Sequence, residues 1–385
     1  MTPIISNAQL TAFCDRVKGD PFIAVDTEFM RETTYWPKLC LIQAAGESDA
    51  AVIDPLAEGL DLAPFLALLA DPKITKVFHA ARQDLEIFNI LGVLPAPLFD
   101  TQIASMAAGF GEQIAYDALV RQMLKVEIDK SSRFTDWSRR PLSDAQLVYA
   151  LGDVTHLAKL YPKLRDRLER DGRLGWVSEE MNFLIDPALY DVDPEKSWRR
   201  LKPRKFNPRY LAAFKGVAAW RERTAQTRDQ PRGRILKDEA IDEIATQLPL
   251  DIDALGRMRA LPKGWGSSGF GAEMLVALKE ALKDPEAYAP VIERQQGSNQ
   301  PPPGAVVELL KVLLKARAED AGVAAKLIAT VADLEKIAGD DGAGVSALTG
   351  WRRELFGADA LRLKRGELAL VLDGARVRVI ENVRG

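Results

Sequence analysis

Two carboxylates separated by one position follow an apolar run near the N-terminus. Asp26 and Glu28 lie in the segment Phe22–Arg31, which begins with four apolar residues. Side chains on a strand alternate between its faces, so both carboxylates project from the same face. At short range they repel each other unless one is protonated or a cation lies between them. A lone pair of this kind is more often a solvated strand end, so its meaning depends on acids further along the chain.

A third carboxylate occupies a position that suits ligand binding in α/β proteins. Asp84 lies in the first turn of a helix predicted over 82–91, after a strand predicted over 74–80. Strand ends that meet helix starts are the usual place for ligands in such sheets. The helix dipole alone also favours an acid in this turn. Asp100, further on, is expected to be only a helix N-cap.

A fourth carboxylate and a phenol share one face of a later helix. Ser143 and Gln146 form a capping box that defines where this helix starts. Tyr149 and Asp153 are four residues apart, so they stand one turn apart on the same face. Pro162 is expected to kink or end the helix.

Four carboxylates from one strand and two helices form a ligand set for a hard cation. Asp26, Glu28, Asp84 and Asp153 offer the oxygen donors that Mg²⁺ or Mn²⁺ prefers. Two such ions, about 3.5–4 Å apart, can clamp the attacking and leaving oxygens of a phosphodiester. The spacing alone leaves this as a hypothesis beside a set of unrelated surface acids.

The elements around these acids predict an α/β domain with a mixed sheet. Strands predicted over 22–29, 39–44 and 50–55 follow one another at short spacing, which indicates an antiparallel meander. Helices are predicted over 8–18 and 61–70. Strands and helices alternate after this point, which is typical of the α/β class.

Composition indicates a globular protein of two or three domains. The chain has 385 residues, of which 47% are hydrophobic and 28% are charged. No stretch approaches the roughly 18 apolar residues of a membrane span, and the N-terminus lacks the pattern of a secretory signal. Cys14 and Cys40 are too few for a disulfide framework or a cysteine zinc site. We expect a cytoplasmic monomer without membrane contact.

Positive charge is concentrated in one part of the chain. Residues 199–237, the basic segment, hold 13 Lys or Arg against Glu222 and Asp229, a balance of +11. Because the formal net charge is −3, the remaining residues carry −14. Such a block is expected where a protein contacts a polyanion, although a solvated connector is the alternative.

Three stretches resemble the exonuclease motifs of the ribonuclease D family. Residues 26–43, from Asp-Thr-Glu-Phe-Met-Arg to Leu-Ile-Gln, are similar to the first motif over 18 residues. His79-Ala-Ala-Arg-Gln-Asp84 resembles the second motif, and Tyr149-Ala-Leu-Gly-Asp153 resembles the third in the tyrosine-bearing branch of the DEDD exonucleases. The first motif is specific, whereas each of the others is weak alone. The resemblance implies a ribonuclease-H-like α/β exonuclease domain over residues 1–200.

The resemblance also implies a reaction, the 3′→5′ hydrolysis of RNA with release of 5′-mononucleotides. Two divalent cations, Mg²⁺ or Mn²⁺, would activate a water and stabilise the departing 3′-oxygen. Glu28 would also contact the terminal ribose. Tyr149 would orient the water, because a phenol with a pKa of about 10 is a poor base at neutral pH. The cations would be held by Asp26, Glu28, Asp84 and Asp153.

Beyond residue 200 the chain resembles a small helical nucleic-acid-binding module, the helicase-and-ribonuclease-D C-terminal (HRDC) domain. The likeness covers residues 206–290 and is carried by Arg234–Ile241 and by the turn Gly264–Gly271. Residues 291–304 are expected to be a linker. Residues 305–385 resemble a divergent second copy, so two small all-α domains should follow the α/β domain. This second copy has nearly balanced charge, which leaves RNA contact open beside a packing or capping role.

Two basic groups are predicted to contact the RNA backbone, with solvated loops as the alternative. The loop before the helix of Tyr149 supplies Arg133, Arg139 and Arg140. The basic segment supplies Arg199, Arg200, Lys202, Arg204 and Lys205.

Two histidines and two aromatic residues suggest other chemistry. His79 and Asp84 have the spacing of the histidine-bearing branch, but Tyr149 holds the third-motif position, so His79 is not expected to be catalytic. His156 is expected to be structural or exposed. Phe29 and Tyr35 could stack on a terminal base, with core packing as the alternative for Phe29.

The expected substrate is RNA with a free 3′ end, such as tRNA precursors and other stable RNAs. A 3′→5′ exodeoxyribonuclease is an alternative that differs in its response to the 2′-hydroxyl. A catalytically silent RNA-binding module is another, although the intact acids and Tyr149 argue against it.

Overall fold

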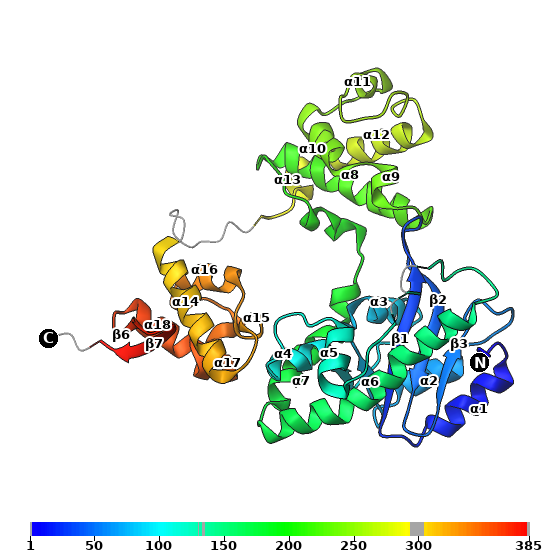
Figure 1. Cartoon of the computed structure of the whole chain (residues 1–385). Helices are drawn as coiled ribbons and strands as arrows, with labels where there is room; N and C mark the ends of the chain where they lie inside the picture. The colour runs from blue at the N-terminus through cyan, green and yellow to red at the C-terminus, as the bar shows by residue number, and fades with distance from the viewer. Residues whose placement is uncertain (1, 130, 133–134, 293–303, 383–385) are drawn as a thin grey trace.

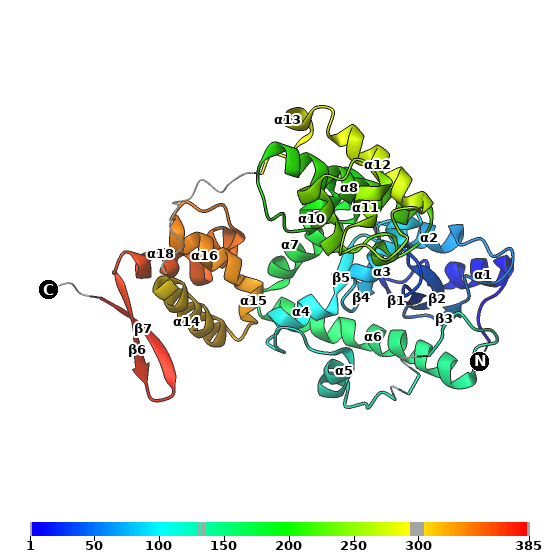
Figure 2. The same cartoon turned by 90° about the horizontal axis from the view of Figure 1, so that it is seen from above.

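The computed structural model describes residues 2–129, 131–132, 135–292 and 304–382. An N-terminal α/β domain is followed by two groups of helices, which lie at different sides of that domain (Figures 1 and 2). We call residues 208–288 the first helical body and residues 304–381 the second helical body.

The sheet of the α/β domain has five strands in the order β3-β2-β1-β4-β5. Strands β1, β2 and β3 pair antiparallel, whereas β4 is parallel to β1 and β5 is parallel to β4. The predicted mixed sheet and its antiparallel meander are therefore confirmed. The short strand β5 was not predicted, because three residues carry no periodic pattern. The strands are β1 (Phe22–Met30), β2 (Lys38–Ala45), β3 (Ala50–Ile53), β4 (Thr75–Phe78) and β5 (Leu98–Asp100).

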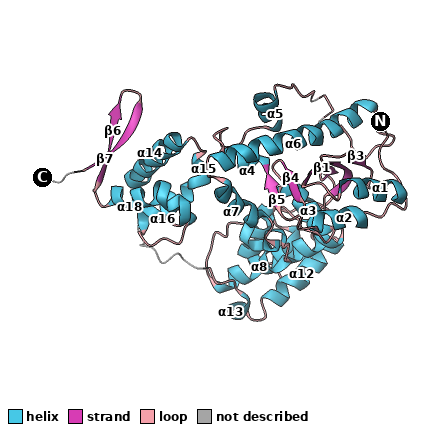
Figure 3. Ribbon diagram, turned by 90° about the horizontal axis from the view of Figure 1, so that it is seen from below, coloured by secondary structure: helices cyan, strands magenta, loops and turns pink. Residues whose placement is uncertain are grey.

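Helices cover the sheet on both faces. Figure 3 shows the strands between α6 on one side and α2 and α3 on the other. The parallel strands follow from the helical crossovers, since a parallel neighbour requires a long connection. The helices of this domain are α1 (Asn7–Val17), α2 (Ala63–Ala70), α3 (Arg82–Ile90), α4 (Thr101–Ala107), α5 (Tyr116–Leu124), α6 (Asp144–Arg170) and α7 (Leu174–Leu184).

Helix α6 begins where the sequence predicts but does not end at its proline. Ser143 and Gln146 form the capping box. The helix continues through Pro162 to Arg170, so of the predicted kink or end at Pro162 the end is wrong, whereas the kink stays a prediction. Tyr161 and Leu164 are buried on either side of the proline, and their packing holds the helix to the core.

Asp100 is the predicted N-cap of α4 and also fixes the start of the site helix α3. Its carboxylate accepts hydrogen bonds from the backbone amides of Gln102 and Ile103. It accepts two more from the amides of Ala80 and Ala81, at 3.0 and 2.8 Å. The Asp100 carboxylate thus binds the residues that lead into α3 and also the first residues of α4.

The two helical bodies repeat the same order of helices. Each begins with a long helix of 20 or 18 residues, followed by a helix of four residues and one of 10 or nine. Buried Ile241 and Ile244 in the first body correspond to Leu334 and Ile337 in the second, 93 positions later. The second body also ends in a hairpin that was not predicted. The first body comprises α8 (Pro208–Thr227), α9 (Arg232–Ile235), α10 (Asp238–Gln247), α11 (Ile252–Gly256), α12 (Gly269–Ala281) and α13 (Pro285–Tyr288). The second comprises α14 (Gly304–Ala321), α15 (Ala325–Ile328), α16 (Val331–Gly339), α17 (Gly350–Arg352), α18 (Ala358–Lys364), β6 (Leu368–Asp373) and β7 (Arg376–Glu381).

The first helical body is joined to the β1–β2 loop by a buried polar network. The hydroxyl of Tyr35 donates to Glu222, and the Nε of Arg232 donates to the same carboxylate at 2.6 Å. The Asp229 carboxylate accepts from the backbone amides of Tyr35 and Trp36 at 3.0 and 2.9 Å. The loop that follows the acid-bearing strand is therefore fixed to the helices.

The second helical body docks on α7 through an aromatic stack and a buried arginine. The rings of Trp176 and Trp351 stack with centroids 4.2 Å apart and an interplanar angle of 5°. Arg352 is buried and pairs with Glu179 at 2.8 Å and with Glu180. One continuous apolar cluster spans both sides of this contact.

Among the described residues, no helix is both long and apolar enough to cross a membrane.

We expect Glu222→Gln to lower the free energy of unfolding of the first helical body by about 3 kcal/mol, because it leaves the partly buried Arg232 without its charge partner. Urea unfolding followed by tryptophan fluorescence would measure the loss. Glu239→Gln, which changes an exposed acid of α10, is the matched control. Equal unfolding midpoints for the two variants would contradict the expectation.

The same contact should depend on pH. Burial by itself would raise the pKa of Glu222, but hydrogen bonds from Arg232 and Tyr35 hold that pKa below its ordinary value of 4.5. The stabilisation is therefore complete above pH 4.5 and is lost as the pH falls through the lowered pKa. Glu222→Gln should lack this acid-dependent loss.

Candidate active site

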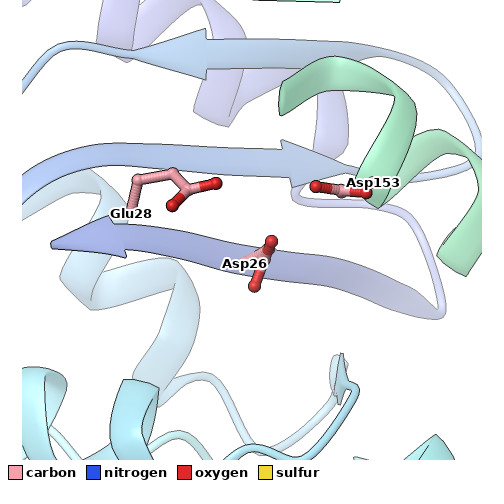
Figure 4. A group of neighbouring side chains, drawn as sticks. All are labelled: Asp26, Glu28 and Asp153. Atoms are coloured by element: carbon pink, nitrogen blue, oxygen red, sulfur yellow. The ribbon is translucent and has the colours of Figure 1, made fainter. Parts of the chain in front are cut away.

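Three carboxylates from β1 and α6 converge at the centre of the α/β domain. Asp26, Glu28 and Asp153 each offer an oxygen, and these oxygens lie within 4.8 Å of one another. Figure 4 shows the two acids of β1 on one face of the strand, with Asp153 approaching from α6. The predicted same-face arrangement of Asp26 and Glu28 is therefore present in the fold.

A β-bulge shifts the pairing of β1 with β2 next to these acids. The pairing of β1 with β2 shifts between Glu28 and Phe29, where Glu28 pairs with Leu41 and Phe29 with Leu39. The skipped residue, Cys40, is fully buried. Bulges near active sites change the direction of the side chains that follow, and this one lies directly after Glu28.

Asp84 lies beside the three-carboxylate group but is not a member of it. Its carboxylate accepts a hydrogen bond from the hydroxyl of Thr27, the residue between Asp26 and Glu28. Burial, and then the negative charge of Asp26, raises the pKa of Asp84 well above its ordinary value. Asp84 is thus close enough to interact with Asp26, while its hydrogen bond holds it against the strand.

Burial dominates the electrostatics of Asp26. It raises the pKa of Asp26 to about 6, although a hydrogen bond from the backbone of Thr27 opposes the shift. Desolvation and like charges both disfavour an ionised carboxylate. A bound cation would offset both effects.

The predicted phenol, Tyr149, lines a cavity together with Asp26 and Asp153. The cavity has a volume of about 310 Å³, and the ring of Tyr149 lies 6.1 Å from that of Trp137. Side chains that line it include Asp26, Asp153, Tyr149, His79, Gln102 and Tyr116.

Tyr116 belongs to this site but was not predicted. Its hydroxyl donates a hydrogen bond to the backbone carbonyl of Asp153. Burial, followed by the charge of Asp153, raises the pKa of the phenol, which keeps it protonated as a donor. It is the first residue of α5, and no spacing in the sequence relates it to the acids.

His79 also lines the cavity, but its side chain is not part of the group in which the carboxylates converge. Its Nδ1 lies 2.9 Å from the hydroxyl of Thr101, and its ring lies 5.2 Å from that of Tyr116. Burial lowers the pKa of His79, which favours the neutral ring. His156 forms a hydrogen bond with the carbonyl of Gly152 on its own helix, in keeping with a structural role.

Tyr35 has a different role from the predicted base stacking. It is buried and bound to Glu222, so its ring is part of the contact with the first helical body. The guanidinium of Arg232 covers the ring at 4.5 Å. Sequence reasoning missed this role because Glu222 and Arg232 lie far along the chain.

The arginines of the loop before α6 differ in their availability for RNA. Arg139 is exposed and pairs with Asp136 at 3.3 Å. Arg140, in contrast, pairs with Asp54 at 2.6 Å and donates to the carbonyls of Cys40 and Trp137. These contacts give Arg140 a role in the fold, and its predicted phosphate contact stays a prediction. Arg133 lies outside the described residues.

Acids from elsewhere in the chain offset much of the basic segment. Arg223 pairs with Glu195 at 2.8 Å, and Arg228 pairs with Glu273 at 2.9 Å. Buried Arg221 pairs with Asp238. The local balance of +11 therefore overstates the free positive charge of this surface.

The predicted RNA-binding residues of this segment divide into two groups. Arg200 lies 3.4 Å from Glu222, and Arg204 lies 3.6 Å from Asp242. Arg199 has its guanidinium 6.0 Å from the ring of its neighbour Trp198. Within the described ranges, no ion pair involves Lys202 or Lys205, which leaves these two lysines available to an external anion.

The donor set fits a divalent cation. Carboxylate oxygens alone converge here, and hard ions such as Mg²⁺ and Mn²⁺ prefer oxygen ligands. The residues that could hold such ions are Asp26, Glu28 and Asp153, with Asp84 next to Asp26.

Comparison with known proteins matches two parts of the chain to families and most of it to relatives. A family described as 3′-5′ exonuclease matches residues 1–169, and the HRDC domain matches residues 211–277. Ribonuclease D of Granulibacter bethesdensis is 50% identical over 380 residues, which cover 98% of this chain and 96% of that protein. Ribonuclease D of Acidiphilium cryptum is 52% identical over 373 residues, covering 97% and 95%.

A solved structure agrees with these matches. The crystal structure of Escherichia coli RNase D, described as an exoribonuclease involved in structured RNA processing, superposes with a TM-score of 0.80. The identity is 30%, and the match covers 95% of this chain and 99% of that one.

We expect Asp26→Asn to stabilise the metal-free protein. The raised pKa of Asp26 means that its ionised form disfavours the fold. Its contribution to stability is complete below the ordinary pKa of 3.8 and is lost as the pH rises through about 6. Thermal unfolding in EDTA at pH 7.5 should show a midpoint roughly 3–6 °C higher for Asp26→Asn.

The control for this measurement is Asp166→Asn, an exposed acid on α6. It should not change the midpoint. A lower midpoint for Asp26→Asn at pH 7.5 would contradict the repulsion inferred at the site.

Proposed function

The chain belongs to the ribonuclease D family and is a 3′→5′ exoribonuclease, and on this basis we propose how it acts and on what. The proposed reaction uses two divalent cations, Mg²⁺ or Mn²⁺, and releases 5′-mononucleotides one at a time. The proposed substrates are tRNA precursors and other stable RNAs with a free 3′ end. The relative from Escherichia coli acts in structured RNA processing, which supports this substrate class.

One observation carries the proposal, namely the convergence of the Asp26, Glu28 and Asp153 oxygens beside a cavity that Asp26, Asp153 and Tyr149 line. Carboxylates brought this close under burial repel each other unless one is protonated or a cation lies between them, and a bound cation would let all of them ionise. When bound, divalent cations would lower the pKa of a water and stabilise the departing oxygen. Asp26, Glu28 and Asp153 would hold them, and Asp84, whose pKa is raised by burial and then by the nearby charge of Asp26, is proposed as the fourth ligand.

The remaining residues of the site orient the reacting groups. In the proposed reaction, a water oxygen attacks the terminal phosphorus, the bond to the 3′-oxygen breaks, and that oxygen takes up a proton. Tyr149 would donate a hydrogen bond that aligns the water. A phenol with its pKa of about 10 does not serve as the base at neutral pH. Tyr116 would keep Asp153 in place through the backbone of α6.

We also propose a division of the chain into an exonuclease domain and two HRDC-like domains. The predicted limits are 1–200, 206–290 and 305–385, with a linker over 291–304. Trp198 and Leu201 pack against the core of the first helical body, which favours a boundary before them. The 93-residue repeat supports the second HRDC-like copy.

The RNA backbone would be contacted by the lysines and arginines whose charge is not offset within the chain. Lys202 and Lys205 are the strongest of these candidates. Arg199, whose guanidinium lies near the ring of Trp198, would support them. Arg139, Arg200 and Arg204 would do so from ion pairs in which the arginine itself is exposed, since such pairs contribute little to stability.

A 5′-labelled RNA with a free 3′-hydroxyl tests the reaction. With Mn²⁺ or Mg²⁺, a ladder that shortens from the 3′ end is expected, and a blocked 3′ end should stop it. Asp153→Asn should lower turnover by about 10³-fold, because it removes a charged ligand. Tyr149→Phe should lower turnover by roughly 10–100-fold with little change in RNA affinity.

Three outcomes would count against this proposal. Equal turnover for Asp153→Asn and wild type would contradict the assignment of Asp153 as a metal ligand. A loss of affinity alone in Tyr149→Phe would remove the water-orienting role. Faster degradation of a DNA strand of the same sequence would favour the alternative of an exodeoxyribonuclease.

We expect the double change Lys202→Glu and Lys205→Glu to weaken RNA binding and reduce its salt dependence. The slope of log K against log[salt] should fall in magnitude by roughly 0.7 for each lost phosphate contact. Fluorescence anisotropy with Asp153→Asn as background prevents degradation during the titration. Lys73→Glu, an exposed lysine of the α/β domain, is the control. An unchanged slope in the double variant would place the RNA elsewhere.

A further inference from the structure

Gln43 is a buried amide without a hydrogen-bond partner. Its side chain is fully buried, on the middle of β2. Neither its Oε1 nor its Nε2 bonds to any other residue that the structure describes. Buried polar groups are nearly always hydrogen-bonded, so each exception requires an explanation.

The neighbours of Gln43 make this amide unexpected on packing grounds. Leu41, Ile42 and Ala44 surround it along β2, and all are buried. An apolar side chain would fill this position without the cost of burying an amide. A buried amide at a position that packing alone would fill with an apolar side chain is expected where function requires it.

The sheet register sets Gln43 next to a site carboxylate. Gln43 pairs with Asp26 on β1 and with Val52 on β3. Residues directly opposite each other on neighbouring strands share a face, with Cβ atoms about 5 Å apart. The amide of Gln43 therefore projects from the same face as the carboxylate of Asp26.

Helix α6 covers this face. Leu41 and Val52, which flank Gln43 on the sheet, pack in one cluster with Leu147 and Ala150 of α6. Ala150 precedes Asp153 by one helical turn. Gln43 thus lies on the sheet face that α6 covers, opposite Asp26 in the register, although it does not itself line the cavity.

We propose that Gln43 is a positioning residue of the metal site, whose Nε2 donates a hydrogen bond to the carboxylate of Asp26 when a cation is bound. This inference rests on the proposed two-metal function. Carboxylates that ligate metals are themselves hydrogen-bonded, and loss of such partners typically lowers metal affinity by about 10–100-fold. Asp26 faces acids on its cavity side, so a donor from the sheet would fix which of its oxygens faces the cation.

Calorimetric titration of the metal-free protein with Mn²⁺, without RNA, tests this role. Gln43→Leu and Gln43→Met both remove the amide and keep a similar volume. Each should weaken Mn²⁺ binding by about 10-fold or more. Leu41→Met is the matched control, two positions away on the same strand and face, and should bind Mn²⁺ with wild-type affinity.

Thermal unfolding distinguishes a role of Gln43 in positioning Asp26 from a role in stabilising the core. In EDTA, Gln43→Leu should unfold at the wild-type midpoint or higher, because it removes an unpaired buried amide. With saturating Mn²⁺, the rise in its midpoint should be smaller than that of wild type. If Gln43→Leu proves too unstable to titrate, Gln43→Met carries the same comparison.

The outcomes distinguish this inference from the proposed function. Mn²⁺ affinities within twofold of wild type for both variants would overturn the role of Gln43 while leaving the metal site intact. Failure of the wild-type protein to bind Mn²⁺ would overturn the proposed function, and this inference with it. Weaker binding in both variants and unchanged binding in Leu41→Met would support it.

Discussion

Repulsion between carboxylates that burial brings together is the constraint on which the α/β domain depends. Asp26 and Asp84 both have raised pKa values, and burial is the main cause for each. The fold overcomes this cost by placing β1 inside the sheet, paired on both sides, and by packing α6 across it. Apolar burial thus provides the free energy that holds the acids in a geometry they would otherwise avoid.

The supports of the site act mainly through backbone atoms and uncharged groups. Asp100 binds the amides at the start of α3, the hydroxyl of Thr27 binds Asp84, and the hydroxyl of Tyr116 binds the carbonyl of Asp153. None of these contacts adds a positive charge next to the acids. These contacts therefore leave the negative potential of the site undiminished, while they fix the positions of the carboxylates.

Local patterns in the sequence predicted much of this arrangement. The alternation along β1 gave the shared face of Asp26 and Glu28, and the capping box gave the start of the helix that carries Tyr149 and Asp153. Contacts between distant segments could not be predicted in this way. Tyr35 pairs with Glu222, and Arg140 pairs with Asp54, so each has a role in the fold that its local sequence does not indicate.

The basic segment illustrates the same limit for charge. Its balance could be counted from the sequence, but the acids that offset it, such as Glu195 and Glu273, lie outside its bounds. The α/β class and the mixed sheet were predicted correctly from element order and periodicity, whereas the helical C-terminal region was predicted correctly from its resemblance to HRDC domains. Which arginines of the basic segment form ion pairs depends on tertiary contacts, which only the three-dimensional structure shows.

The contact between Tyr116 and the main chain at Asp153 has a practical consequence. Because the hydroxyl binds the carbonyl and not the carboxylate, the scaffold does not depend on the acid that it presents. On the proposed mechanism, an amide in place of that acid would leave the backbone contact intact while it impairs hydrolysis. Such a chain would serve as a bait that retains RNAs by their 3′ ends, so that sequencing of the captured molecules would identify the natural substrates in the cell.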